Sequence, residues 1–291
     1  MPKRIAFVTC STKSDFAGND MPVVEVLRAV GIDVHPRPWD VDSTDWNSFD
    51  LVVIRSCWNY HLHPMKFIQW IDQMEKQKVK MFNPLKVVRW NLHKGYLKDL
   101  GSKGIALPET VWLNQGTQAN LSSLMSEKNW GKAVVKPAIS ATAFNTFLIS
   151  KEEADEQQKK FESLLSQADL LVQKFMKEVP EQGEWSLIFF NNKFSHAVIK
   201  KPAGEDFRVQ NDFGGHATAT NPPGFVLKQS EKILSLIDQP LLYARVDGVV
   251  SANRFLLMEL ELIEPMLFLE KEDCSAKAFG QAMINIIKND N

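Results

Sequence analysis

The chain has 291 residues, 44% of them hydrophobic, and a formal net charge of −1. This length allows a substantial core divided among two or three subdomains, because single cores stop growing near ~250–300 residues. The balanced charge and the lack of a basic block argue against nucleic acid and membrane surfaces as partners. Apolar runs are only strand-sized, and the first ten residues are typical of a strand rather than a signal peptide, so we expect a cytoplasmic protein.

The chain has three cysteines, Cys10, Cys57 and Cys274, which are far apart in sequence and lack paired metal spacing. We therefore expect free thiols. Cys57 has His61 and His63 close by, so a catalytic thiol or a zinc site is an alternative there. A structural thiol is the favoured interpretation, since no further cluster supplies the missing ligands.

The first eighty residues alternate in α/β style. Apolar runs predict strands over 4–10, 32–39 and 49–58, with a helix over 22–31 between the first two. A helical pattern follows over 63–77, and a short strand over 78–84 ends at a proline. The pattern predicts a three-layer α/β domain over residues 1–84.

Ligands bind at the carboxyl ends of strands in open α/β sheets, so the ends of the first and third strands form a plausible substrate rim. Thr9 and Cys10 end the first strand, and Arg55 leaves the third one. A guanidinium there can hold a substrate carboxylate bidentately, or it can form an ion pair that caps the sheet. Both interpretations of Arg55 stay open at this stage.

The remaining chain predicts a mixed α and β region in two parts, 85–170 and 171–291. A helix is expected over 85–101, with Lys94 in its middle, before a glycine-punctuated turn. Lys136 lies at the end of a predicted strand over 132–138. The other expected elements are a polar-faced helix over 151–167, a strand over 170–176, a hairpin over 184–202 that turns at Asn191-Asn192, and a helix over 278–289.

Two apolar strands near the C-terminus carry acidic residues. Glu259 and Glu261 are two apart in the run 255–265, so both are expected on one face, with Met258, Leu260 and Leu262 on the other. Arg245 and Asp247 alternate in the same way in the run 241–250. Neighbouring carboxylates are costly to bury unless a cation lies between them, and a hard divalent ion with oxygen ligands is the usual solution. The alternative is a pair of edge strands whose charged faces meet water.

Several cations could neutralise a phosphate-bearing ligand. The ammonium of Lys136 would sit where the chain leaves a buried strand, which suits phosphate oxygens. Arg208 alternates with Phe207 and Val209, and Gly214-Gly215 follows with a backbone that a ligand can approach closely. Neither a P-loop nor a GxGxxG motif is present, so the sequence argues against those two nucleotide sites.

The order of these features resembles the ATP-grasp superfamily along nearly the whole chain. Within it, the chain is most similar to glutathione-synthetase-like ligases and to relatives of the cycloserine-forming (O-ureido-serine) cyclo-ligase. The runs that carry this likeness are RSCWNYHLHP, NPLKVVRWNLHKGYL, VVKPAISATAFNT, GEWSLIFF and MELELIEP. The resemblance implies an ATP-grasp fold behind an N-terminal three-layer α/β domain. It implies a carboxylate–amine ligase that uses ATP and Mg²⁺, or Mn²⁺, and passes through an acylphosphate.

The resemblance also assigns roles to residues. The phosphates would be bound by Lys94, Lys136 and Arg208, and the metal by Asp247, Glu259 and Glu261. Arg245, with Arg208, would stabilise the charge that develops on the transferred group. The purine would lie against Gln173, Lys174, Phe175 and Met176, with Glu181 or Glu184 at the ribose. Substrate choice would depend on Arg55, Ser56, Asn59, Gly214 and Gly215.

Two departures from the family pattern leave a rival function open. Glu261 stands where most of the superfamily has asparagine, and the loop after Lys136 lacks the usual glycines. A non-catalytic ATP-binding regulator of the same fold is therefore an alternative, as is a hydrolase that uses Cys57 or the paired carboxylates. We expect a small-molecule carboxylate and amine, amino-acid-like or peptide-like, as substrates of either an intermolecular ligase or a cyclo-ligase, and a homodimer as the assembly.

Overall fold

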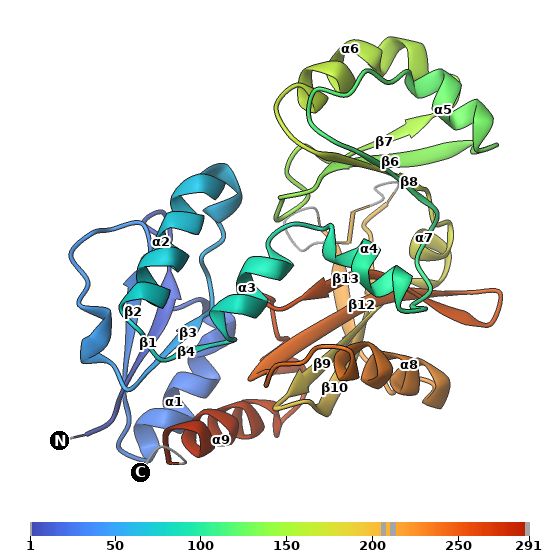
Figure 1. Ribbon diagram of the computed structural model, residues 1–291. Helices are drawn as coiled ribbons and strands as arrows, with labels where there is room; N and C mark the ends of the chain where they lie inside the picture. Colours follow the sequence, from blue (N-terminus) through green and yellow to red (C-terminus); the bar gives the residue numbers. More distant parts are fainter. Residues whose placement is uncertain (1, 205–207, 210–213, 289–291) are drawn as a thin grey trace.

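The computed structural model describes residues 2–204, 208–209 and 214–288, and these form three sheets (Figure 1). The first sheet is parallel, in the order β2-β1-β3-β4. Its strands are β1 (Arg4–Thr9), β2 (Asp33–Pro38), β3 (Leu51–Ile54) and β4 (Met81–Phe82). All of β3 is buried, as a parallel strand covered on both faces requires. The strands predicted for residues 1–84 are therefore confirmed.

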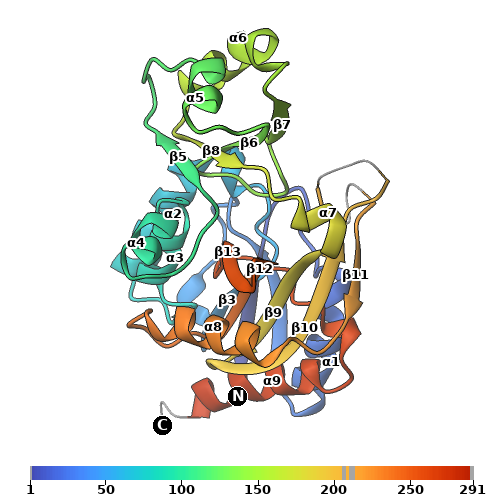
Figure 2. The ribbon, with the colours of Figure 1, turned by 90° about the vertical axis from the view of Figure 1, so that its right-hand side faces the viewer.

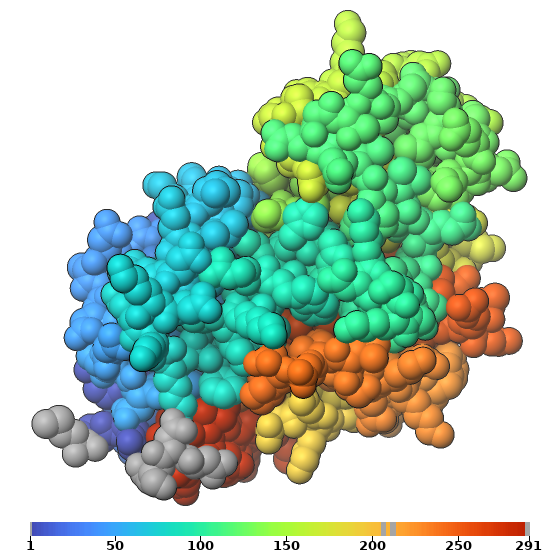
Figure 3. Space-filling model, viewed as in Figure 1, coloured from blue at the N-terminus to red at the C-terminus, as the bar shows by residue number. Residues whose placement is uncertain are grey.

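Helices cover both faces of this sheet, which gives the expected three layers. Alternate strand residues such as Ala6 and Val52 pack against α2 (Pro64–Lys76). The opposite face, including Phe7 and Val53, packs against α1 (Met21–Ala29) and α9 (Ser275–Lys288). Figure 1 shows α9 beside α1, and Figure 3 shows the red C-terminal residues at the bottom of the molecule. The two ends of the chain thus share one core.

The second sheet is antiparallel and has the order β5-β8-β6-β7. Two helices, α5 (Leu121–Glu127) and α6 (Ala154–Leu165), cover it and complete a separate core around Trp130 and Phe161. Figure 1 shows this unit standing apart at the top of the molecule. Its strands are β5 (Thr110–Leu113), β6 (Lys132–Pro137), β7 (Phe147–Ser150) and β8 (Leu170–Lys174).

The third sheet is antiparallel and has the order β11-β10-β9-β12-β13. Asn191 and Asn192 have positive φ angles at the β9–β10 turn, so the predicted hairpin is confirmed. Figure 2 shows α8 (Gly224–Ser235) against this sheet. The strands are β9 (Glu184–Phe190), β10 (Lys193–Lys201), β11 (His216–Ala219), β12 (Tyr243–Ser251) and β13 (Arg254–Glu261); the short α7 (Glu178–Gln182) precedes β9. No helix in the described ranges is long and apolar enough to span a bilayer.

The prediction of a single helix over 85–101 is wrong, because the helix is interrupted at Lys94. The chain forms two short helices, α3 (Leu85–Asn91) and α4 (Tyr96–Ser102), and Lys94 lies in the turn between them. The backbone N–H of Lys94 donates to the carbonyl of Ala138 at 2.8 Å, outside any helix. This tertiary hydrogen bond takes the place of a helical one at Lys94. The single helix that the sequence pattern predicts is therefore interrupted there.

The prediction that Met258 packs opposite Glu259 is also wrong. Asp247 pairs with Glu259 across β12 and β13, but the next residue, Gly248, pairs with Leu257. This β-bulge adds one residue to β13, and strict alternation therefore stops at Met258. Met258 instead lines the same cavity as Glu259. Leu260 and Leu262 do lie in the core, as expected.

Candidate functional site

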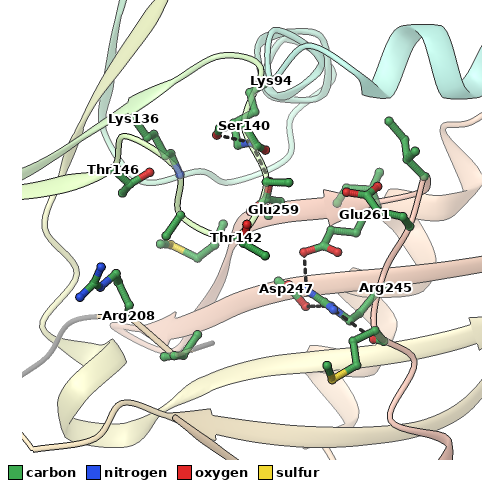
Figure 4. A pocket seen from close by; sticks show the side chains of 18 of the residues that line it. Lys94, Lys136, Ser140, Thr142, Thr146, Arg208, Arg245, Asp247, Glu259 and Glu261 are labelled. Atoms are coloured by element: carbon green, nitrogen blue, oxygen red, sulfur yellow. Dashed lines mark hydrogen bonds and ion pairs between the residues drawn. The ribbon is translucent and has the colours of Figure 1, made fainter. Parts of the chain in front are cut away.

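A cavity of about 580 Å³ lies where the three sheets meet, and residues from all three line it. The N-terminal sheet contributes the loops that follow β1 and β3, including Cys10 and Trp58. The second sheet contributes Lys136 and Gln173. The third contributes its acidic strands, and Figure 4 shows the two lysines opposite these strands. Cavities at such junctions are the usual place for small-molecule sites.

Asp247 is the most strongly held carboxylate in the cavity. Its side chain is 2% exposed and accepts hydrogen bonds from Arg245 Nη2 at 2.8 Å, Ser186 Oγ at 2.6 Å and Lys200 Nζ at 3.1 Å. Burial raises the pKa of Asp247, but Arg245 and Lys200 outweigh burial and lower the pKa to about 2. Asp247 is therefore ionised throughout the physiological pH range.

Glu259 contacts a cation from another part of the chain. Its Oε1 lies 3.1 Å from Lys94 Nζ, and Lys94 also donates to the backbone oxygen of Ser140 at 2.9 Å. The turn between α3 and α4 thus places Lys94 directly against the acidic strand. Burial raises the pKa of Glu259, but Lys94 and Lys136 lower it more, so the net shift is downward.

Glu261 and Arg245 are register partners on β13 and β12, and their side chains form an ion pair. Burial raises the pKa of Glu261 to about 8, and the carboxylates of Asp247 and Glu259 add to the shift although Arg245 opposes it. Negative charge is thus crowded at this point. In the part of the chain that the structure describes, no three His, Cys, Asp or Glu side chains are arranged to hold a metal ion.

The donor set nevertheless fits a hard divalent cation. Asp247 and Glu259 are direct cross-strand partners, and Glu261 is on the same side of β13. All three offer carboxylate oxygens, which Mg²⁺ prefers. A divalent ion would offset the crowding that raises the pKa of Glu261. Binding would require all three carboxylates to exchange present contacts for the metal: Glu259 with Lys94, Glu261 with Arg245, and Asp247 with one or more of Arg245, Lys200 and Ser186.

The other predicted cation, Lys136, faces the same cavity from β6. Its Nζ donates to Gln173 Oε1 at 3.2 Å. Burial lowers its pKa, Glu259 opposes that shift, and the positive charge of Lys94 adds to it. Two ammonium groups that repel each other in a buried site suit an anionic ligand between them. Arg208 lines the cavity as well.

Residues predicted to hold the nucleotide base also line the cavity. They are Gln173, Lys174, Phe175 and Met176, at the end of β8 and just beyond it. Of the two acids considered for the ribose, Glu184 lines the cavity, where it pairs with Lys200 at 2.6 Å. Glu181 is exposed on α7 and is not among the lining residues.

The predicted substrate residues are only partly brought together. Asn59 lines the cavity, with its amide held by Trp39 and Asp40. Ser56, Gly214 and Gly215 are not among the lining residues, and their substrate role stays a prediction.

Arg55 has the second of its two expected roles, an ion pair. Its side chain is 1% exposed, and its Nη2 lies 2.8 Å from Asp20 Oδ1, away from the cavity lining. Cys57 is fully buried, and burial raises the pKa of its thiol well above the usual value. A buried protonated thiol is inert, which agrees with the structural interpretation.

Two cavity residues were missed by sequence reasoning, Lys200 and Glu264. Lys200 bridges Glu184 and Asp247, and its position in the apolar run HAVIKK was an available signal. Glu264 lines the cavity three residues beyond Glu261, where the strand has ended. Strand alternation could not place it, because alternation has no meaning in a turn.

Comparisons with known proteins agree with this geometry. Residues 5–83 match the family model described as D-cycloserine synthetase DcsG, N-terminal domain. The chain is 28% identical, over 98% of its length and 99% of the relative's, to the cycloserine biosynthesis protein DcsG of Streptomyces lavendulae. The crystal structure of D-cycloserine synthetase DcsG superimposes with a TM-score of 0.87 at 25% identity, covering 98% of this chain and 99% of that one.

More distant solved structures share the fold. The D-alanine–D-alanine ligase of Bacillus anthracis matches with a TM-score of 0.70 at 14% identity, over all of both chains. The ATP-grasp ligase PsnB with its minimal precursor matches with a TM-score of 0.67 at 15% identity, over 98% of this chain and 99% of that one. The expected resemblance and fold class are therefore confirmed. The chain has the fold of the ATP-grasp ligases, and along nearly its whole length it is similar in sequence and structure to the D-cycloserine synthetase DcsG.

Proposed function

We propose that this protein is an ATP- and Mg²⁺-dependent carboxylate–amine ligase that acts through an acylphosphate on an amino-acid-like or peptide-like small molecule. The observation that carries the proposal is the cavity in which Lys94 and Lys136 lie opposite Asp247, Glu259 and Glu261. Phosphoryl transfer needs positioning and charge neutralisation more than covalent chemistry. A site with cations on one side and acids on the other supplies both.

Each group has a role in this proposal. Lys94, Lys136 and Arg208 would bind phosphate oxygens. Asp247 and Glu259, with Glu261, would hold Mg²⁺, which would draw the phosphate oxygens towards β12 and β13 and neutralise their charge.

Arg245 is placed to stabilise the charge that develops on the transferred phosphoryl group. Its guanidinium already spans Asp247 and Glu261 and is fixed by the carbonyl oxygen of Met266 at 3.0 Å. A fixed donor costs little reorganisation during the reaction. An amine of the same molecule or of a second one would then displace phosphate. The number of added small molecules that ADP release requires, one or two, separates a cyclo-ligase from an intermolecular ligase.

The test is ADP release from ATP and Mg²⁺ in the presence of pools of D- and L-amino acids, O-ureido-serine and short peptides. Release that depends on a pool supports the proposal. ATP binding with no release in any pool would instead favour the regulatory alternative. The Glu259→Gln variant should lose metal-dependent turnover while its fold, measured by circular dichroism, is retained. Turnover equal to that of the unsubstituted protein would refute the metal role of Glu259.

A further inference from the structure

Strand β13, which carries Glu259 and Glu261, ends the sheet order β11-β10-β9-β12-β13 and pairs with β12 along one side. The other side of a terminal strand leaves backbone N–H and C=O groups without a ladder, and burying such groups is costly unless other donors and acceptors meet them. Leu260 stands between the two glutamates. Its own backbone groups point to this outer side, because successive residues of an antiparallel strand hydrogen-bond in opposite directions. The outer edge of β13 therefore needs partners at the residue between two candidate metal ligands.

Two buried side chains, those of Asn91 and Tyr96, supply these partners. The backbone N–H of Leu260 donates to the phenol oxygen of Tyr96 at 3.0 Å, and its C=O accepts from Asn91 Nδ2 at 2.8 Å. The N–H of Leu262 donates to Asn91 Oδ1 at 2.9 Å, so one amide group meets two backbone groups as a neighbouring strand would. We call Asn91 and Tyr96 the edge clasp. It fixes both backbone hydrogen-bonding groups of Leu260.

The edge clasp belongs to a turn that is itself held in place. One clasp residue ends α3 and the other begins α4, so they flank Lys94. The backbone N–H of Lys94 donates to Ala138, and its Nζ lies 3.1 Å from Glu259 Oε1 (Figure 4). The neighbouring His93 places its Nε2 3.1 Å from Asp169 Oδ2. The segment that places a candidate phosphate-binding lysine thus also holds the backbone of the acidic strand.

The edge clasp contacts the backbone of β13, whereas the ion pairs of this strand involve its side chains. Glu259 pairs with Lys94 and Glu261 pairs with Arg245, and a bound metal would take the place of these contacts. The hydrogen bonds of Leu260 do not involve the carboxylates, so they can remain when the carboxylates turn to a metal. Mg²⁺ demands near-ideal octahedral geometry, whereas Ca²⁺ accepts more ligands in a flexible arrangement. A fixed backbone between two carboxylates suits the stricter ion.

We propose that Asn91 and Tyr96 are positioning residues of the metal site: by fixing Leu260 they set the spacing of Glu259 and Glu261, and so make the site favour Mg²⁺ over a larger divalent ion. The inference rests on the proposed function and adds metal selectivity to it. Residues that orient metal ligands without binding the metal change metal affinity about 10–100-fold when they are substituted. A clasp that only satisfied buried backbone groups would change stability and leave metal selectivity as it is.

The experiment measures metal-dependent ADP binding by titration calorimetry, apart from turnover. The affinity for ADP is measured with saturating Mg²⁺, with saturating Ca²⁺ and with EDTA, and the ratio of the affinity with a metal to that in EDTA defines the coupling of that metal. The variants are Asn91→Ala and Tyr96→Phe. The matched control is Ser275→Ala, which removes a buried hydrogen bond of 2.7 Å to the carbonyl of Leu269, away from the cavity lining. Melting temperatures, and ADP release with ATP and the substrate pools, are recorded in parallel.

We expect each clasp variant to lower the Mg²⁺ coupling about tenfold and the Ca²⁺ coupling less than about threefold, while the ADP affinity in EDTA stays within about twofold. Ser275→Ala should lower the melting temperature and leave both couplings unchanged. Unchanged Mg²⁺ coupling, or equal losses for the two metals, in a folded Tyr96→Phe protein would overturn the inference, and this conservative variant decides alone if Asn91→Ala does not fold. ADP binding by the unsubstituted protein that needs no metal would overturn the metal site and the inference together. Intact coupling without ADP release would count against the ligase function alone.

Discussion

The buried ion pair between Arg55 and Asp20 yields a quantitative test of what stabilises the N-terminal unit. Asp20 Oδ1 accepts from Arg55 Nε at 3.1 Å and from Nη2 at 2.8 Å, and both side chains are at most 2% exposed. The guanidinium also lies 5.3 Å from the ring centre of Tyr243 and 5.5 Å from that of Phe279. The Asp20→Asn variant would leave this buried cation without its counter-charge.

Breaking a buried pair by removing one partner costs about 3–5 kcal/mol. Asparagine keeps one oxygen that can accept from Arg55, so we expect about 3 kcal/mol, the lower end of that range. An unfolding entropy of about 2.1 cal/mol/K per residue gives about 0.6 kcal/mol/K for this chain, and the melting temperature should fall by about 5 °C.

The matched control is Asp72→Asn on the surface. Asp72 pairs with Arg89 at 2.5 Å, but the two side chains are 58% and 39% exposed. Exposed pairs contribute about 0–1 kcal/mol, so the melting temperature should change by less than about 2 °C. Both variants are compared by scanning calorimetry. If Asp20→Asn melts no lower than Asp72→Asn, the buried pair does not stabilise the fold in the way we infer.

Three further predictions follow from single residues. Burial lowers the pKa of His196 below its ordinary value of 6.5, although the carbonyl of Leu267 opposes the shift. The stability that the neutral ring contributes is complete above pH 6.5 and is lost as the pH falls through the lower pKa of the folded state. In His196→Gln the urea midpoint should therefore fall less steeply on the acid side of its pH profile, and an unchanged profile would contradict this. In Gly248→Ala the new Cβ would lie 2.5 Å from the backbone oxygen of Leu256, whereas in Gly131→Ala it would meet no atom within 4 Å. The melting temperature should therefore fall in Gly248→Ala and stay unchanged in Gly131→Ala. Lys136→Met should weaken ATP binding about tenfold or more by calorimetry, because a charge-assisted hydrogen bond contributes about 1.5–3 kcal/mol; affinity equal to that of the unsubstituted protein would remove Lys136 from the phosphate site.

Strand alternation was sufficient to bring much of the candidate site together. Arg245 and Asp247 share one face of β12, and Glu259 and Glu261 meet them across the sheet, as period-two alternation requires. The same rule failed at Met258, because the bulge beside Gly248 shifts the register by one residue. A glycine inside an otherwise apolar strand was the available sign of that bulge.

Contacts between distant segments could not be predicted from local patterns. The periodicity over 85–101 gave no sign that Lys94 leaves the helix, because its backbone N–H donates to the carbonyl of Ala138, which is distant in sequence. The two interpretations of Arg55 were equally open, and only the position of Asp20 in the fold separates them. In both cases the deciding partner lies tens of residues away in the sequence.

Residues 262–266, which follow β13, are held by side chains from distant parts of the chain, each of which donates a hydrogen bond to one backbone carbonyl. The hydrogen-bond donors come from β12, from the loop after β3 and from the start of the segment that leads to α3, so Glu259 and Glu261 before this segment and Glu264 within it are placed by the whole fold. Glu259 pairs with Lys94, Glu261 pairs with Arg245, and Glu264 lines the same cavity. One continuous segment, 259–264, thus presents three carboxylates to a single cavity, and their positions depend on donors from three separate parts of the chain.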